Sequence, residues 1–588
     1  METPLTAPIP TPVPPDARAP APPRETERAA RGVAPAAVTG LAPPVEPGRD
    51  APRPRSSIAR AFDALPGRGV DARVRALHDN NEAWLATWHV LGSARSRVDV
   101  SYFILDRDVF GHAFLGQLLR HRRNDIPVNA VVDAAGDSFG RTGFTSSLRG
   151  QDYLQELVAA GANVSVYNPY YRKVPRVIAE RDLALAAANH DKILVTERYG
   201  ITGGRNIGHQ YYSSRRDLGM PFRDSDVVVD GAEAAAQLRR AVTVEMERDD
   251  LNHRITPDMY GNLVSREAEL LGAAAMMDHW LNRAPLSQAM RQRLRTEPAV
   301  REHYAAEMVR AARADLRRRR VDVGELALGN LHGRALELAA NADLAGANRG
   351  FRIDANMEDA RVKALDRTSN AAAPHAFDQI EPSIERLLAA ARDRVVITNP
   401  YIVLSERVRR ALAAAGRRGV RITILTDSPT TADNPLYAAF FMREWPRLLA
   451  RVPNLRVFVL TGDQRMHAKT LVADGEVGLI GSSNMDLLSA EVNGEIMEAI
   501  HSRAAARRLE AQFERDRRDP RNGVVEYTIR RDRRGRPVLR DGQPVVTFGP
   551  EHHVASGRLR AQEAIWKPLS RWIETWPQAQ SLRGPEAR

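Results

Sequence analysis

Two stretches of this 588-residue sequence carry the residues best suited to chemistry, and their residues follow the same order. The first is HDKILVTERYGITGGRN (190–206) and the second is HAKTLVADGEVGLIGSSN (467–484). Each has a histidine, a lysine two residues later, an apolar run, an acid, a short connection and Gly-Gly/Ser-x-Asn. The histidine and lysine pairs are His190 with Lys192 and His467 with Lys469, and the acids are Glu197 and Asp474. A repeated motif of this length predicts a functional site.

The side chains of the two motifs can act together on a phosphate. In a β-strand, residues i and i+2 share a face, so the histidine and lysine of each copy point the same way. If the two halves pack about a pseudo-twofold axis, two histidines and two lysines surround one anion. One imidazole can attack phosphorus while the other protonates the leaving alkoxide, and this chemistry needs no metal ion or other cofactor. The amides of Asn206 and Asn484 are predicted to assist the lysines, and Gly204 and Ser482 to contact the substrate.

A carboxylate on the second ring nitrogen of a histidine would fix its tautomer and stabilise the imidazolium. Glu495, which lies 28 residues after His467, is the first candidate for this role. Asp224 occupies the corresponding strand entry in the first half, and either acid could instead lie at the surface. We favour His190 as the nucleophile and His467 as the general acid, and the reverse assignment stays open.

Lysine is scarce in this chain, which makes each lysine informative. Of the 85 basic residues, five are lysines: Lys173, Lys192, Lys363, Lys469 and Lys567. Where arginine fills nearly every other basic position, a lysine indicates a site that needs a compact ammonium rather than a planar guanidinium.

Composition limits the classes of function. The net charge of +12 favours anionic partners such as acidic phospholipid or nucleic acid. The sequence has no cysteine, which excludes disulfides, thiolate metal sites and cysteine nucleophiles. It has no apolar run of about 18 residues and no secretory signal at its start, so we expect a cytoplasmic protein, either soluble or peripheral to a membrane.

The order of predicted elements indicates an α/β fold made of two tandem units. Apolar β-rich runs alternate with helical patterns in 97–169 and again in 394–460, and an HxK motif follows each succession. We therefore predict mostly parallel sheets flanked by helices, with the two units forming one pseudo-twofold active site. The predicted segments are a disordered Pro/Ala/Arg-rich tail (1–57), a first catalytic half (58–231), a helical insertion (232–350), a second catalytic half (351–520) and a C-terminal hairpin with a Trp-rich helix (521–588).

The Trp-rich helix, IWKPLSRWIETW (565–576), has its apolar residues on one face. That face could rest on a membrane surface, because tryptophan favours the head-group region, or it could pack against the second catalytic half.

The paired HxKx4(D/E) motifs with G(G/S)xN resemble those of the phospholipase D superfamily. The flanks SYFILDRDVFG, VYNPYY, GGRNIGHQYY, FRDSDV, NPYIV, LTDSPTTADN, NGEI and YTIRRDRRGRPV resemble bacterial cardiolipin synthases and related phospholipase D-like proteins. The first motif departs from the family in having Glu197 where aspartate is usual and a connection one residue shorter. The resemblance implies a phosphatidyltransferase or phospholipase D that acts on a phospholipid such as phosphatidylglycerol, with a lipid alcohol or water as the acceptor.

Two other functions are compatible with these motifs. A nuclease could use the same two-histidine chemistry without a metal, but the sequence contains no recognisable nucleic-acid module, so we expect no nucleic-acid partner. A non-enzymatic scaffold would be expected to have lost catalytic residues, whereas both His-Lys-Asn sets are present. We expect the protein to work as a monomer at a phospholipid membrane surface.

Overall fold

The computed structural model describes residues 56–134, 136, 153–168, 178–181, 187–248, 251–256, 265–369 and 377–576. These residues belong to one compact unit, Arg55–Arg588. The predicted N-terminal tail lies almost entirely outside the described residues, as does Lys173.

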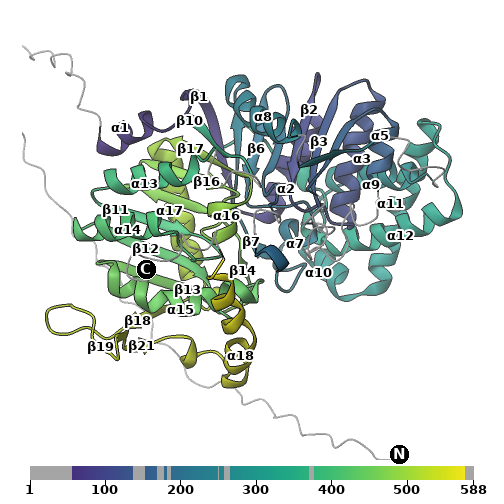
Figure 1. Cartoon of the computed structure of the whole chain (residues 1–588). Helices are drawn as coiled ribbons and strands as arrows, with labels where there is room; N and C mark the ends of the chain where they lie inside the picture. Colours follow the sequence, from purple (N-terminus) through teal and green to yellow (C-terminus); the bar gives the residue numbers. More distant parts are fainter. Residues whose placement is uncertain are drawn as a thin grey trace, which may run out of the picture. The chain divides into compact units, whose positions relative to one another are not determined.

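The first half builds a mixed sheet around three parallel strands (Figure 1). Its strands are β1 (Val70–Leu77), β2 (Val98–Tyr102), β3 (Val128–Asp133), β4 (Asn163–Tyr167), β5 (Lys192–Val195), β6 (Tyr199–Gly203), β8 (Asp226–Asp230) and β9 (Asn252–Arg254). Strands β2, β3 and β4 are parallel, whereas β5 returns antiparallel beside β2 and is followed by β6, β8 and β1. Strands β2, β5, β6 and β8 are buried along their whole length, as expected for a sheet that is covered on both faces.

The second half repeats this arrangement strand for strand. Its strands are β10 (Glu358–Arg367), β11 (Arg394–Thr398), β12 (Arg421–Asp427), β13 (Leu455–Leu460), β15 (Thr470–Ala473), β16 (Val477–Gly481), β17 (Glu495–His501) and β18 (Val525–Ile529). Strands β11, β12 and β13 are parallel, and β15 returns antiparallel beside β11 before β16, β17 and β10. The strands that carry the two HxK motifs, β5 and β15, therefore occupy equivalent places.

The two halves are joined through the antiparallel pair β1 and β10, which makes one continuous 17-stranded sheet. A single buried cluster contains Ile193 and Val229 from the first half together with Val472, Ile480 and Ile496 from the second. The halves thus share a hydrophobic core directly behind the two motif strands.

The helices repeat as well. In the first half they are α1 (Ser57–Asp63), α2 (Asn80–Ser93), α3 (Val109–Arg123), α5 (Leu154–Ala159), α7 (His209–Tyr212) and α8 (Ala232–Met246). In the second half they are α13 (Ile380–Ala390), α14 (Glu406–Arg417), α15 (Pro435–Arg451), α16 (Leu487–Glu491) and α17 (Arg503–Arg518). Helix α8 follows β8 as α17 follows β17, and side chains of both helices enter the shared core. Helix α1 instead packs in the core of the second half through Ile58 and Phe62.

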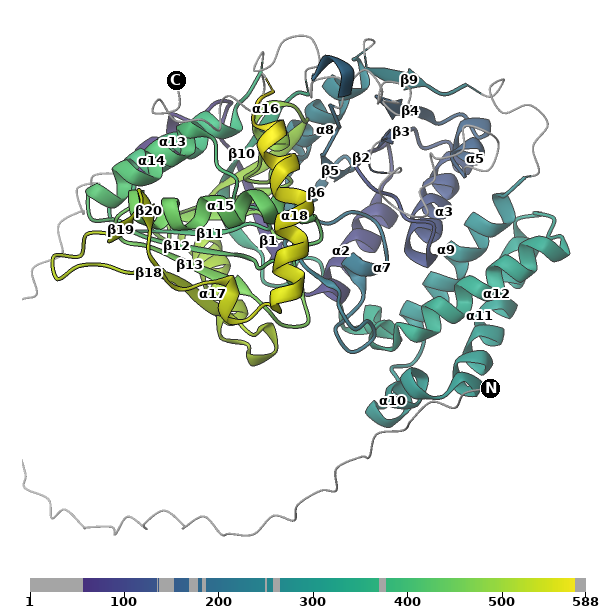
Figure 2. The same ribbon diagram turned by 60° about the horizontal axis from the view of Figure 1, so that its bottom comes forward.

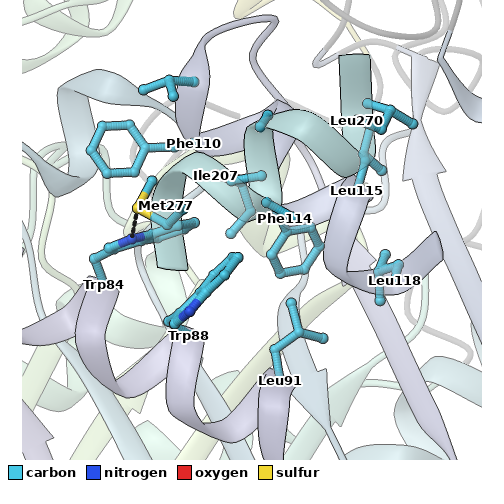
Figure 3. Packing of buried hydrophobic residues seen from close by; sticks show 14 of the residues in the cluster. Trp84, Trp88, Leu91, Phe110, Phe114, Leu115, Leu118, Ile207, Leu270 and Met277 are labelled. Carbon is cyan, nitrogen blue, oxygen red and sulfur yellow. Dashed lines mark hydrogen bonds between the residues drawn. The ribbon is translucent and has the colours of Figure 1, made fainter. Parts of the chain in front are cut away.

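Four further helices form a separate layer beside the first half (Figure 2). They are α9 (Glu267–Asn282), α10 (Gln288–Thr296), α11 (Pro298–Arg318) and α12 (Glu325–Ala340). Helix α9 lies against α3, where Gly116 is so close to the carbonyl of Leu270 that a Cβ would stand 2.0 Å from the oxygen. Figure 3 shows the packing: Trp84 and Trp88 of α2 lie beside Phe110 and Phe114 of α3, and Trp84 Nε1 donates to Met277 Sδ at 3.2 Å.

The last elements of the described residues are short strands and a long helix on the second half. The elements are β19 (Leu539–Arg540), β20 (Gln543–Pro544), β21 (Val546–Phe548) and α18 (Ser556–Ile573). Strand β21 pairs with β18, and a turn around Gly535 (φ 75°) lies between them. Among the helices of the described ranges, none is both long and apolar enough to cross a bilayer.

The prediction of two tandem α/β units with a pseudo-twofold relation is confirmed. The sheets are more mixed than the sequence suggests, because only three strands of each half are parallel to one another. In each half the motif strand is joined to the next strand by a tight turn, between β5 and β6 and between β15 and β16, and a tight turn requires antiparallel neighbours.

We predict that Trp84→Ala lowers the free energy of unfolding by about 3 to 5 kcal/mol, because it leaves a large cavity between α2, α3 and α9. Denaturant unfolding followed by circular dichroism measures the change. The control is Leu326→Ala, whose side chain is 64% exposed on α12 and whose loss should cost less than about 1 kcal/mol. Equal effects of the two variants would contradict this packing.

Candidate functional site

Each motif histidine is paired with a carboxylate from the other half of the chain. His190 Nδ1 lies 3.0 Å from both carboxylate oxygens of Glu495. His467 Nδ1 lies 2.6 Å from Asp224 Oδ2. Both carboxylates are fully buried and both histidines nearly so. The two halves therefore contribute to a single site in a crossed arrangement.

The backbone enforces this crossing. The amide of His190 donates to the carbonyl of Gly494 at 2.9 Å, directly before Glu495. The amide of His467 donates to the carbonyl of Arg223 at 2.8 Å, directly before Asp224. The short strand β7 (Phe222–Arg223) also pairs in parallel with β14 (Arg465–Met466). The backbone of each HxK motif is thus hydrogen-bonded to the segment of the other half that carries the carboxylate partner of its histidine.

The two motif lysines lie beside their histidines and are buried. Lys192 Nζ donates to the carbonyl of His190 at 2.6 Å and lies 5.1 Å from the ring centre of Phe103. Lys469 Nζ donates to the carbonyl of His467 and stands 2.9 Å from Nδ1 of that residue. Burial lowers the pKa of Lys192 to about 7 and also lowers the pKa of Lys469, where Asp224 opposes the shift. Desolvated ammonium groups of this kind favour an anionic ligand.

The two histidine–carboxylate pairs differ electrostatically. Burial opposes ionisation of Asp224, but His467, Lys469 and Arg205 outweigh burial and hold its pKa at about 2. Burial raises the pKa of Glu495 to about 7, although Lys192 and hydrogen bonds from two serines act against the shift. Burial, followed by the charges of Lys192 and Lys469, keeps the pKa of His190 well below its usual value. At neutral pH Asp224 is therefore an anion, whereas Glu495 is close to its midpoint.

The remaining predicted residues lie in the loops beside the histidines. Both polar atoms of the Asn206 side chain are hydrogen-bonded, since Oδ1 accepts from the amide of Ile104 and Nδ2 donates to the hydroxyl of Tyr211. Asn484 differs, because its buried Oδ1 has no hydrogen-bond partner among the described residues. Ser482 Oγ donates to Glu495 Oε2 at 2.5 Å, so Ser482 supports the carboxylate.

Gly204 allows a close approach between the halves. A Cβ on this residue would stand 2.1 Å from Asp224 Oδ1 and 2.8 Å from the carbonyl oxygen of His467. A larger residue would push the loop of the first half away from the second motif.

The motif acids lie at the far ends of the motif strands. Glu197 accepts hydrogen bonds from the amides of Arg95 and Ser96, just before β2. Asp474 accepts from the amides of Arg392, Asp393 and Arg394, just before β11. The two acids therefore fix equivalent loops, and the replacement of aspartate by Glu197 preserves this contact.

Several residues around the site were not identified from the sequence. Ser489 Oγ is a second hydroxyl donor to Glu495, and Arg205 is a buried partner of Asp226 that also binds the carbonyl of Asp224. The rings of Phe222 and Tyr211 flank His467, with centroids at 4.9 and 5.4 Å. The position of Arg205 inside the GGRN segment of the first motif could have identified it from the sequence. No comparable sequence feature marks Ser489. The part of the chain that the structure describes contains no group of three or more His, Cys, Asp or Glu side chains arranged to hold a metal ion.

Comparison with known proteins places this geometry in context. Residues 384–517 match the family model described as "Cardiolipin synthase, PLD-like domain". Cardiolipin synthase 1 of Staphylococcus epidermidis is 31% identical over 144 residues, which are 24% of this chain and 28% of that protein. A cardiolipin synthase of Clostridium perfringens is 20% identical over 431 residues, which are 72% of this chain and 66% of that protein.

The chain thus spans about a quarter of the length of the curated relatives that it matches at about 30% identity. Among solved structures, phosphatidylserine synthase of Haemophilus influenzae Rd KW20 superposes with a TM-score of 0.50 at 14% identity. The superposition covers 79% of this chain and 91% of that protein, and at this identity it concerns the fold alone.

We predict that Lys192→Arg and Lys469→Arg each lower turnover of a phosphodiester substrate by about a hundredfold or more, although the charge is kept. Each buried ammonium group lies against the carbonyl of its histidine, with the ring of Phe103 beside Lys192 and the ring of His467 beside Lys469, and a larger, planar guanidinium would disturb these contacts. Steady-state kinetics measures the loss.

The matched control is Lys363→Arg. Lys363 is also buried, but it donates to the carbonyls of Asp63 and Leu65, away from both histidines. This variant should lower the melting temperature and keep its activity per folded molecule. Near-normal turnover in the two motif variants would contradict the need for a compact ammonium.

Proposed function

We propose that the chain, which matches a PLD-like family model over residues 384–517, is a phospholipase D-superfamily enzyme that transfers or hydrolyses phosphatidyl groups of phospholipids through a phosphohistidine intermediate. The observation that carries this proposal is the crossed pair of buried histidine–carboxylate contacts, with one buried lysine beside each histidine. A two-step displacement at phosphorus requires one neutral histidine for attack and a second that carries a proton for the leaving group.

In the first step His190 acts as the nucleophile. Its low pKa leaves the imidazole neutral, and its contact with Glu495 occupies Nδ1, so that Nε2 carries the reactive lone pair. This nitrogen forms a bond to phosphorus while the bond from phosphorus to the leaving alcohol oxygen breaks. His467 gives its proton to that oxygen. Burial and Lys469 lower the pKa of His467, and the ionised Asp224 beside it opposes this shift and favours the imidazolium form that must hold the proton.

In the second step the acceptor displaces His190. His467, now neutral, takes the proton of a lipid alcohol or water as the acceptor oxygen bonds to phosphorus, and the phosphorus–nitrogen bond breaks. The ammonium groups of Lys192 and Lys469 bind the non-bridging phosphate oxygens in both steps and stabilise the charge that gathers on them. An alcohol acceptor gives a new phospholipid, whereas water gives phosphatidic acid.

The substrate class is tested by incubating the purified protein with labelled phosphatidylglycerol, with phosphatidylethanolamine and with plasmid DNA. We expect a phospholipid to be consumed, and the product to distinguish transfer, which gives cardiolipin from phosphatidylglycerol, from hydrolysis. Cleavage of DNA with no change in either lipid would replace this proposal by a nuclease.

We predict that His190→Ala and His467→Ala each abolish turnover. In His467→Ala a phosphorylated His190 should build up with an activated substrate whose leaving group needs no proton, and mass spectrometry of the tryptic peptide detects it. Wild-type turnover should persist in EDTA, because lysines supply the positive charge that a metal would otherwise provide. Inhibition by EDTA that a divalent ion reverses, or a phosphorylated His467 instead, would overturn these assignments.

The pH dependence of kcat/KM should be a narrow bell. Glu495 has a pKa of about 7 and must lose its proton to accept from His190, so activity rises with pH on the acid side. His467, whose pKa is lowered by burial, and Lys192, whose pKa is about 7, must both keep their protons, so activity falls on the alkaline side. Glu495→Gln should remove the acid limb, whereas Asp224→Asn should leave its position unchanged, because the pKa of Asp224 is about 2. An acid limb that survives in Glu495→Gln would contradict this assignment.

A further inference from the structure

Helix α18 is anchored to the second half by one of its faces. Ser570 is fully buried, and Ile573 packs against a small apolar cluster that includes Tyr437 and Phe440 of α15. Glu574, at the end of the helix, forms two hydrogen bonds with Arg443 of α15, at 2.8 and 3.0 Å. The face of α18 that carries Ser570 and Ile573 therefore packs on the second half, which is one of the two alternatives that the sequence left open.

The opposite side of α18 exposes large apolar side chains. Ile565 is 62% exposed and Trp572 is 37% exposed. These residues are seven apart, so they lie on one side of the helix, two turns from each other. The ring of Trp572 contacts the ring of Trp576 along one edge, with the centroids 5.0 Å apart, and the rest of Trp572 and most of Ile565 leave apolar surface exposed on a helix that is already anchored.

The charge beside these apolar residues is positive. Arg560 and Arg571 are exposed on a stripe that lies about a third of a turn from Ile565 and Trp572 around the helix, and neither forms an ion pair with a described residue. The acid at the end of the helix, Glu574, is neutralised by Arg443. A helix side with isoleucine and tryptophan next to arginines suits the boundary between the head groups and acyl chains of an anionic bilayer. It suits a neutral protein partner less well, because the arginines would need paired acids there.

Helix α18 also lies close to the loop of the second half that carries Asn484 and Asp486. Ile573 and Leu488 pack against the same cluster, and Tyr437 in that cluster forms a hydrogen bond with Asp486. Asp486 is two residues past Asn484. Figure 2 shows α18 crossing in front of the second half, next to the boundary between the two halves. Contact of its outer side with a bilayer would therefore bring lipid head groups near the site.

From these observations we propose that the outer side of α18 docks the protein on the surface of anionic phospholipid bilayers. Ile565 and Trp572 insert into the head-group region, and Arg560 and Arg571 bind lipid phosphates. This inference rests on the proposed function, since a lipid substrate has to be reached at a bilayer surface.

The test is cosedimentation of the full chain with vesicles that contain phosphatidylglycerol, compared with vesicles of phosphatidylcholine alone. The double variant Ile565→Ser/Trp572→Ser should weaken binding to phosphatidylglycerol vesicles about a hundredfold, about tenfold for each apolar side chain removed. Arg560→Gln/Arg571→Gln should weaken it about tenfold and reduce the preference for the anionic lipid. The control is Leu326→Ser, an equally exposed apolar side chain on α12, which should bind as the wild type does.

Circular dichroism and the melting temperature of each variant show whether α18 remains folded. Hydrolysis of a water-soluble phosphodiester, measured in parallel, separates docking from catalysis. Wild-type binding by the double variant would overturn the docking proposal and leave the proposed function intact. The proposal also fails if the wild type forms a dimer that this double variant abolishes while vesicle binding is unchanged, because the outer side would then be a contact between two copies.

Discussion

Two carboxylates exchanged between the halves hold the buried cationic site together. Lys192, Lys469 and two imidazoles share a desolvated region, and such a group of bases would not stay charged there without nearby anions. Glu495 and Asp224 supply those anions, each to the histidine of the other half. Because each contact crosses the pseudo-twofold axis, the site exists only when both halves are docked, and the shared core behind β5 and β15 makes that docking possible.

The pseudo-symmetry is broken where the chemistry needs different proton states. Glu495 receives two serine hydroxyls and has a pKa near neutrality, whereas Asp224 lies among cations and stays ionised. Equivalent strands thus carry histidines with unlike partners, and the proposed mechanism uses this difference by assigning attack to His190 and proton donation to His467. In contrast, Glu197 and Asp474 keep the same role in both halves, since each accepts amide hydrogen bonds from the loop before a parallel strand.

The helices outside the repeated unit differ between the two halves. Helix α8 belongs with the sheet, as α17 does, and the extra layer of α9 to α12 covers α3 of the first half. In the second half α18 covers α15, but only one face of α18 packs on that helix. The amphipathic pattern of 565–576 could not distinguish packing from exposure, because an apolar helix face suits a protein core and a membrane surface equally. In the structure Ile573 packs on the second half, whereas Ile565 is exposed.

The sequence by itself determined the repeated α/β order, the two histidines, the two lysines and the two asparagines. These follow from local patterns, namely period-two apolar runs and a motif of fixed spacing that occurs twice. Both acids could also be found, because each stands at the entry of a buried strand. Only the tertiary structure decided that Glu495 serves His190 and Asp224 serves His467, although each acid follows the other histidine along the chain. The physical reason is that these contacts join residues 243 and 305 positions apart, and such pairings depend on how the two halves pack against each other rather than on any local spacing.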